Sequence, residues 1–156
     1  MNLETYLPYK LASTAESFSQ KLVEVYGRTH GLSREEWRLL FLLADVEQLT
    51  SLELTQRTTL DKVQVSRAAQ KLEEKGLISR SISTSDRRLR VYTCSKKGQE
   101  LFAEIFPKVE AQAEAILRNM SLEEQETLWR SIDALAKAVA THTRNKLAST
   151  VECLDS

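Results

Sequence analysis

Several residue types are scarce in this 156-residue sequence, and each scarcity narrows the range of folds. Four glycines and two prolines favour long helices over a turn-rich all-β fold. The two cysteines, Cys94 and Cys153, do not make a disulfide framework. No apolar run approaches the roughly 18–20 residues that span a bilayer, and the N-terminal segment has no secretory pattern. We therefore expect a soluble, mostly helical protein of the reducing cytoplasm that does not bind membranes.

The net charge of the whole chain is zero, but the charged residues are unevenly distributed along it. The chain has 22 basic and 22 acidic residues. Residues 50–98 hold 11 of the basic and five of the acidic residues, a net charge of +6, so the remainder carries −6. A basic segment of this size is typical of proteins that contact the phosphates of DNA. The alternative is an ordinary solvated surface with a local excess of charge.

Periodic apolar residues and capping boxes predict a series of helices. A Ser-x-x-Glu or Thr-x-x-Glu box begins at Ser33, at Thr50 and at Ser121. The helix after Ser33 is apolar almost all round, so we expect it to be a buried central strut. We expect Gly27 and Gly31 to end the first helix and Pro107 to kink or break the fifth. The predicted helices cover residues 8–26, 33–46, 51–57, 61–75, 95–119 and 121–146.

The third and fourth of these helices are separated by only a short turn, which predicts a helix-turn-helix. Leu52 and Leu54 are the expected anchors of the supporting helix. Asp61 is a favourable N-cap for the following helix and Gly76 a natural end. Val65, Ala69 and Leu72 form an inner stripe, which leaves an outward face of basic and amide side chains that hydrogen-bond base edges and phosphates. A solvated polar face is the alternative.

A β-hairpin with a basic tip is predicted after the helix-turn-helix. Segments 77–82 and 89–94 are rich in β-branched and aromatic residues, and a hydrophilic connector with two arginines lies between them. A basic hairpin tip suits the negative potential of a minor groove. We expect Asp86 to pair with Arg88 and fix its direction; the alternative is a turn-capping aspartate. The fold class is therefore mostly α with a small β-wing, a winged helix-turn-helix flanked by long helices.

Three stretches of the chain resemble the MarR family of bacterial transcription regulators. They are GLSREEWRLLFLLA (31–44), VSRAAQKLEEKGLISR (65–80) and DRRLRVYTCSKKG (86–98). Asp86 and Arg88 match the Asp-x-Arg of the family's wing. The start of the next helix is a looser match, with Cys94 where threonine is usual. The resemblance covers nearly the whole chain.

This resemblance implies one domain over residues 1–156, with a DNA-binding core at about 33–98 and dimerisation helices at about 5–30 and 99–147. The long amphipathic helices carry more apolar surface than one small core needs, which independently favours a homodimer. A dimer would bind a pseudo-palindromic operator, usually as a repressor. Arg88 would enter the minor groove. The expected DNA-binding residues are Lys62, Val63, Gln64, Ser66, Arg67, Gln70, Lys71, Asp86, Arg87, Arg88 and Arg90.

The resemblance also implies release from DNA by a small effector, often aromatic or phenolic, bound between the dimerisation helices and the core. His30 and Arg38 are candidates for holding an acidic effector, and an ordinary surface role is the alternative for both. Taken singly, each apolar candidate is better explained as an ordinary core residue. The expected pocket residues are Phe18, Leu22, His30, Trp37, Arg38, Phe41 and Phe102.

Other functions remain open at this point. A redox-sensing regulator would use Cys94 or Cys153, although the peroxide-sensing branch of the family uses a cysteine near the first helix, which this chain lacks. A metal-sensing regulator would draw on His30, His142 and the cysteines, but no zinc-ligand spacing appears. Nothing resembles a nucleophile elbow or a phosphate-binding glycine loop, so we expect no enzyme, catalytic residue, metal or cofactor. A winged helix that binds proteins is disfavoured by the basic excess.

Overall fold

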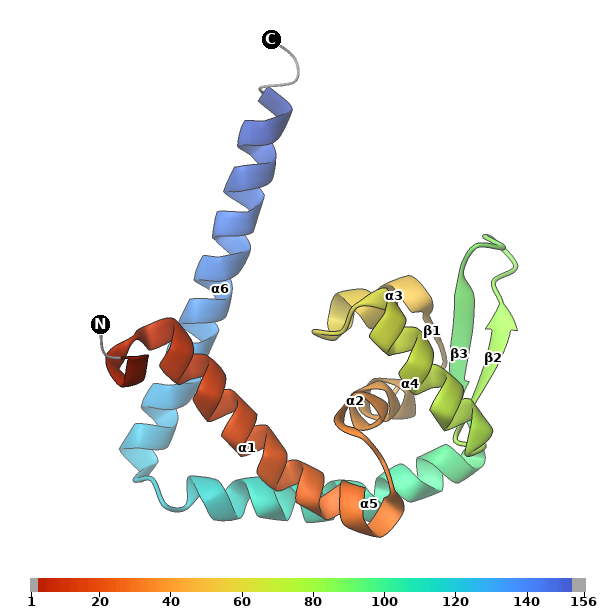
Figure 1. The fold of residues 1–156 in the computed structure, drawn as a ribbon, viewed down its shortest axis with the longest axis horizontal. Helices are drawn as coiled ribbons and strands as arrows, with labels where there is room; N and C mark the ends of the chain where they lie inside the picture. Colours follow the sequence, from red (N-terminus) through yellow and green to blue (C-terminus); the bar gives the residue numbers. More distant parts are fainter. Residues whose placement is uncertain (1–2, 153–156) are drawn as a thin grey trace. The chain divides into compact units, whose positions relative to one another are not determined.

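The computed structural model describes residues 3–152 and contains six α-helices and a small antiparallel sheet (Figure 1). No helix among these residues is both long and apolar enough to cross a membrane. The predicted fold class, mostly α with a small β-wing, is confirmed. The elements are η1 (Leu3–Thr5), α1 (Leu7–His30), α2 (Arg34–Ala44), β1 (Leu49–Thr50), α3 (Ser51–Arg57), α4 (Lys62–Glu74), β2 (Ile78–Ile82), β3 (Arg90–Cys94), α5 (Lys96–Leu117) and α6 (Leu122–Glu152).

The chain divides into two compact units, one up to Ala113 and one from Glu114 onward. The first unit contains the sheet, helices α1 to α4 and most of α5. The second contains the end of α5 and helix α6. In the second unit the predicted capping box is confirmed: Glu124 Oε2 accepts the amide of Ser121 at 2.7 Å, and Ser121 Oγ accepts the amide of Glu124 at 3.1 Å.

Helix α2 is the central strut of the first unit, as its apolar sequence predicts. Trp37, Leu39, Leu40 and Leu43 are buried, and α2, α3 and α4 gather beside the sheet (Figure 1). The predicted capping box at Ser33 forms and fixes the start of the helix. The helix is not buried all round, however, because 44% of Phe41 is exposed.

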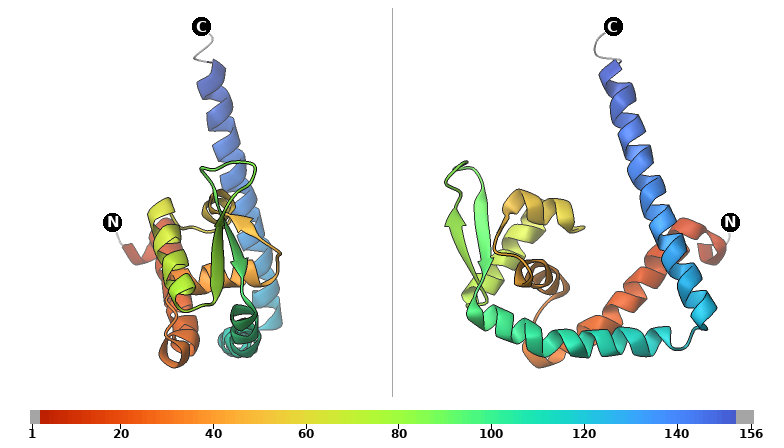
Figure 2. Two further views of the ribbon diagram at one scale, coloured as in Figure 1. Left: turned by 90° about the vertical axis from the view of Figure 1, so that its right-hand side faces the viewer. Right: turned by 180° about the vertical axis from the view of Figure 1, so that it is seen from behind.

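The sheet has the strand order β1–β3–β2, with both pairs antiparallel. The hairpin runs in register from Ile78 opposite Cys94 to Ile82 opposite Arg90, close to the predicted strands, and its loop extends past the helices of the core (Figure 2). Strand β1 was not predicted. It has only two residues, which is too short for an alternating pattern to appear in the sequence.

The predicted break at Gly27 is wrong, because α1 continues to His30. A single glycine inside a helix costs only about 1 kcal/mol, which the neighbouring turns offset. The helix ends where predicted at Gly31, which takes the left-handed conformation with φ of 63°. The amide of Gly31 donates to the carbonyl of Gly27 at 3.0 Å and closes the last turn.

Three further expectations need correction. Helix α5 continues through Pro107, so no break occurs; the buried residues Ile105 and Val109 on either side hold the helix against the core. Helix α6 extends to Glu152, beyond the predicted end near residue 146. Leu52 is not an anchor of α3: 46% of it is exposed, whereas Leu54 is fully buried. Sequence spacing alone did not distinguish these two leucines.

Candidate nucleic-acid interface

Helix α4 has one buried face and one exposed polar face. Asp61 caps the helix in a reciprocal box with Gln64, whose backbone amide donates to Asp61 Oδ1 at 2.8 Å. The inner stripe is buried as predicted, and Ala68 joins it. On the other face every predicted contact residue is exposed: Lys62, Val63, Gln64, Ser66, Arg67, Gln70 and Lys71.

Two of these side chains are already engaged within the protein. Gln64 Oε1 accepts the amide of Asp61 at 3.0 Å, which leaves its NH₂ group as the polar group to contact a base. Gln70 Nε2 donates to Glu74 Oε1 at 3.0 Å. Arg67 makes no ion pair within the described chain, and its guanidinium can donate two parallel hydrogen bonds to guanine. Val63, 57% exposed, presents an apolar surface of the kind that contacts a thymine methyl group.

The wing tip is held by a compact set of hydrogen bonds. The amide of Ser83 donates to the carbonyl of Leu89, and the amide of Leu89 donates to the carbonyl of Asp86, both at 3.0 Å. Ser83 is buried, and its hydroxyl lies 3.0 Å from that of Ser85. These bonds form a turn that leaves Arg87, Arg88 and Arg90 exposed.

The predicted pairing of the Asp86 and Arg88 side chains is wrong. Instead, Asp86 Oδ1 accepts the backbone amide of Arg88 at 2.9 Å, and no ion pair joins the two side chains in the described structure. A carboxylate two residues before an amide closes a local turn with little loss of conformational freedom. Among the described residues the Arg88 guanidinium therefore has no acidic partner of its own.

Helix α4 and the wing meet at one groove. It encloses about 340 Å³ and receives predicted contact residues from both elements, namely Lys62 and Ser66 from α4 and Arg88 and Arg90 from the wing. Ser51, Leu52 and Thr55 of α3 also line it, and no pattern in the sequence predicts that they do. The groove is completed by Val65, Leu89 and Tyr92. Cationic side chains thus surround a partly apolar floor, an arrangement that suits a DNA backbone.

The structure brings together only part of the predicted effector pocket. Trp37 stacks on Phe102 with ring centroids 5.5 Å apart, and Phe41 meets Phe102 edge-on at 5.7 Å. Two rings that the prediction missed, Tyr26 and Phe106, extend this stack. The sequence predicts Phe18 and Leu22 of α1 and Phe102 of α5 as pocket residues, but no local pattern distinguishes Tyr26 and Phe106 from other apolar residues of the same helices. Burial raises the pKa of Tyr26.

The other pocket candidates lie around or away from these rings. Leu22 packs against the core and Phe18 is half-buried. His30 Nε2 lies 3.7 Å from Glu104 Oε1, with a side chain 13% exposed. Arg38 points elsewhere: its Nη1 donates to Thr59 Oγ1 at 2.7 Å.

Cys94 does not have the features of a redox sensor. It is buried, its sulfur lies 3.8 Å from the carbonyl oxygen of Leu77, and burial raises the pKa of its thiol. A reactive cysteine needs an accessible thiolate. Cys153, the other candidate, lies outside the described residues. Within residues 3–152 no three His, Cys, Asp or Glu side chains are arranged to hold a metal ion.

Comparisons with known proteins agree with this geometry. The MarR family model matches residues 30–89. Two uncharacterized HTH-type transcriptional regulators of Bacillus subtilis are similar in sequence. YdgJ is 29% identical over 69% of this chain, a match that spans only 63% of YdgJ itself. YxaD is 32% identical over 71% of this chain and 78% of its own length.

Solved structures share the fold. A MarR/EmrR family regulator from Acinetobacter sp. ADP1 has a TM-score of 0.78 at 23% identity, covering 90% of this chain and 99% of that one. BpsR of Bordetella bronchiseptica, whose DNA binding is regulated by 6-hydroxynicotinic acid, has a TM-score of 0.77 at 15% identity over 87% and 96%. NadR, solved in complex with 4-hydroxyphenylacetate, has 0.74 at 20% over 87% and 98%. With its winged helix-turn-helix and these relatives, the chain belongs to the MarR family of DNA-binding transcription regulators, which are not enzymes.

Proposed function

We propose that this regulator binds a pseudo-palindromic operator as a homodimer in the cytoplasm, represses transcription, and is released by a small aromatic or phenolic effector. One observation carries the DNA-binding part: Lys62 and Ser66 of α4 and Arg88 and Arg90 of the wing, all of them exposed, line one groove. A helix in the major groove and a basic hairpin tip in the minor groove is the geometry that a winged helix uses. In this role Arg67 reads a base and Arg88 follows the minor groove.

The dimer is supported by apolar side chains that a single chain leaves exposed. In α6, Trp129 is 62% exposed and Ile132, Leu135 and Val139 are between 40% and 58% exposed. Near the start of α1, Leu7 is 68% exposed and Leu11 46%. Exposed apolar side chains along a helix, as on each of these two helices, are typical of a protein–protein interface. The proposed dimerisation helices remain those at about 5–30 and 99–147.

The effector is supported by the stacked rings of Trp37, Phe41 and Phe102 with Tyr26 and Phe106. Aromatic rings bind another flat ring through offset stacking and edge contacts. BpsR and NadR, which share the fold, respond to or bind aromatic acids. The remaining candidates for the wall of this site are Phe18, Leu22 and His30, whereas Arg38 bonds to Thr59 instead.

Selection from a random-sequence pool of DNA duplexes tests this proposal. We expect the wild-type protein to enrich an inverted repeat, and its affinity for that repeat to fall steeply as salt rises, because binding releases counterions. Aromatic acids and phenols would then be screened for release of the selected duplex. Enrichment of no sequence, or an affinity that does not change between low and moderate salt, would contradict the proposal.

A further inference from the structure

Three charged side chains of α2 each bond to a different part of the first unit. Arg34 bonds to α1, Glu36 bonds to the end of α4, and Arg38 bonds to the turn that precedes α4. Two of these contacts lie at opposite ends of the helix that we expect to read DNA. We propose, on the basis of the DNA-binding function above, that α2 sets the position of α4 through Glu36 and Arg38, and that Glu16 and Arg34 transmit movements of α1 to it.

The contact at the end of α4 is largely buried. The Glu36 side chain is 2% exposed, and both of its oxygens accept from Lys75 Nζ, at 2.9 and 3.0 Å. Lys75 is the C-cap of α4 and also donates to the carbonyl of Gly31, at the end of α1, at 2.8 Å. Glu36 Oε2 accepts the amide of Ser33 at 2.6 Å. The end of α4 is thus tied to the start of α2 and the end of α1.

The contact before α4 involves a single charge-assisted hydrogen bond. Arg38 Nη1 donates to Thr59 Oγ1 at 2.7 Å, and Thr59 lies two residues before the N-cap Asp61. Such a short bond to a guanidinium is stronger than a bond between neutral groups. Together, Arg38 and Glu36 fix both ends of α4 on the same helix, which limits sliding and tilting of α4 on the core.

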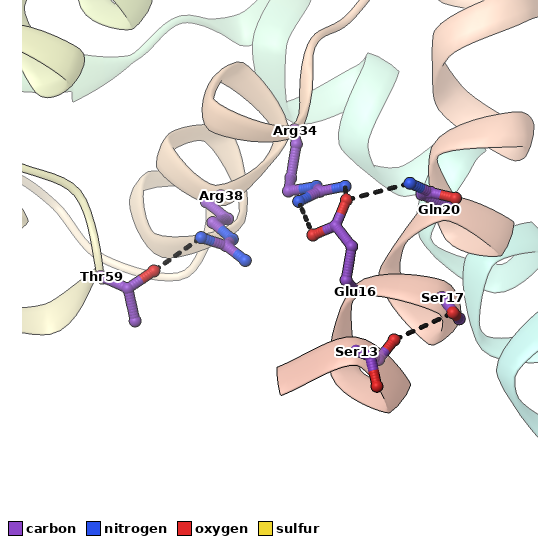
Figure 3. A network of polar contacts seen from close by, with 7 residues as sticks. All are labelled: Ser13, Glu16, Ser17, Gln20, Arg34, Arg38 and Thr59. Atoms are coloured by element: carbon purple, nitrogen blue, oxygen red, sulfur yellow. Dashed lines mark hydrogen bonds and ion pairs between the residues drawn. The ribbon is translucent and has the colours of Figure 1, made fainter. Parts of the chain in front are cut away.

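The link to α1 lies one turn from Arg38, on the same face of α2 (Figure 3). Arg34 Nη1 and Nη2 donate to the two oxygens of Glu16 at 2.6 and 2.7 Å, and Gln20 donates to Glu16 Oε1 at 3.1 Å. This pair is half-exposed, with 25% of the Arg34 side chain and 49% of the Glu16 side chain accessible. Water competes for this pair, so it is a link that a movement of α1 can break.

The first experiment removes the hydroxyl of Thr59 without changing any charge. For each variant, affinity is measured at fixed salt for the duplex selected by the wild-type protein and for a shuffled duplex of equal length. For Thr59→Val we expect the ratio of the two affinities to fall about tenfold, the scale of one lost base contact, with affinity for the shuffled duplex unchanged. Thr59→Ser should retain the wild-type ratio. A purely structural role would lower the melting temperature and leave the ratio intact, which would overturn the inference.

The second experiment separates the effect of the Glu36–Lys75 pair on the position of α4 from its effect on the stability of the fold. Lys75→Met leaves a buried carboxylate without its partner and should destabilise the fold, whereas adding Glu36→Gln removes that penalty. We expect the double variant to melt closer to the wild type yet to keep a reduced affinity ratio. A double variant with the wild-type ratio would overturn the role of this pair.

The third experiment tests the link to α1 with a double-mutant cycle. Glu16 and Thr59 do not bond to each other, so their effects on the affinity ratio should multiply to within about twofold if they are independent. If α2 transmits movements of α1, the combined effect of Glu16→Gln and Thr59→Val on the affinity ratio should depart from the product of the single effects by more than twofold. The matched control is Glu24→Gln, which breaks an exposed ion pair within α1 and should combine independently with Thr59→Val. Independent behaviour of Glu16 would overturn the link.

Failure of this inference can be distinguished from failure of the proposed DNA-binding function. A wild-type protein that selects no duplex overturns DNA reading and, with it, the inference. A wild-type protein that discriminates strongly, together with variants that discriminate equally well, overturns the inference alone.

Discussion

The winged core buries most of its apolar side chains, whereas helix α6 leaves most of its apolar side chains exposed. In the core, Leu39, Leu40, Leu43 and Leu54 are each 0% exposed. In α6, no side chain among those described is buried, and Trp129 is 62% exposed. The core therefore completes its own packing within one chain. Helix α6 carries an apolar surface that one chain leaves uncovered, so the two regions should respond differently to the same kind of substitution.

The largest effect is expected from truncation in the core. Leu40→Ala removes a fully buried side chain and should lower the free energy of unfolding by about 2–5 kcal/mol. Because this packing lies within one chain, the loss should not depend on protein concentration. Urea unfolding at two concentrations measures it. A loss below 1 kcal/mol would mean that the core is less closely packed than the structure indicates.

A smaller effect, and one that depends on concentration, is expected in α6. Ile132→Ala should weaken the proposed dimer by about 2–4 kcal/mol, since each of two copies loses most of a buried side chain. The melting temperature should then fall most in dilute solution. Sedimentation equilibrium and melting curves over a range of concentrations check this. If Ile132→Ala behaved like Leu40→Ala, or had no effect on association, the contrast between the two regions would be lost.

Within the core, the two arginines of the proposed DNA-binding surface should differ from each other. Arg67→Ala should cost about 1–3 kcal/mol in operator binding and relax discrimination at one base position. Arg88→Ala should weaken binding to all sequences and reduce the salt slope by about 1, unless the site has a narrow A·T-rich minor groove. Each variant serves as the charge-matched control for the other. Identical effects on sequence preference would contradict these roles.

The smallest effect concerns pH. The hydrogen bonds from Arg34 lower the pKa of Glu16 from 4.5 to about 2. A carboxyl group whose pKa is depressed by folding stabilises the fold above its unfolded pKa, and that contribution is lost as the pH falls from about 4.5 towards about 2. The stability difference between the wild type and Glu16→Gln should therefore be constant above pH 5 and shrink below it. Because the pair is half-exposed, the effect should be small.

Carboxyl chemical shifts recorded during an acid titration report on Glu16 directly. A titration midpoint near 4.5 would show that the ion pair with Arg34 does not persist in solution. The link between α1 and α2 would then lose its electrostatic basis.

Local sequence chemistry predicted much of this structure. Three capping boxes, the aspartate cap at Asp61 and the glycine end at Gly31 set helix ends within a few residues, because each acts through hydrogen bonds to nearby backbone. The same locality explains the exposed face of α4 and the basic wing tip. Local patterns also misled at Gly27, where packing of the surrounding helix outweighed the intrinsic cost of the residue, and Pro107 does not break α5.

Side-chain partners distant in sequence were not predictable. The bonds of Glu36 to Lys75 and of Arg38 to Thr59 join residues 39 and 21 positions apart, and the sequence offered no reason to choose those partners. The sequence-based prediction paired the Asp86 carboxylate with the side chain of Arg88, whereas the carboxylate accepts the backbone amide of Arg88. Tyr26 and Phe106 joined the aromatic stack only because three helices fold together.

The sequence by itself determined the order of the six helices and the hairpin, the basic character of residues 50–98 and the family. Periodicity, capping and charge are properties of neighbouring residues, so they survive without knowledge of the fold. Only the tertiary structure decided which charged side chains hold α4 in place, that Cys94 is buried, and that α6 leaves its apolar face exposed. Burial and pairing depend on distances between segments far apart in the chain, and those distances exist only once the chain has folded.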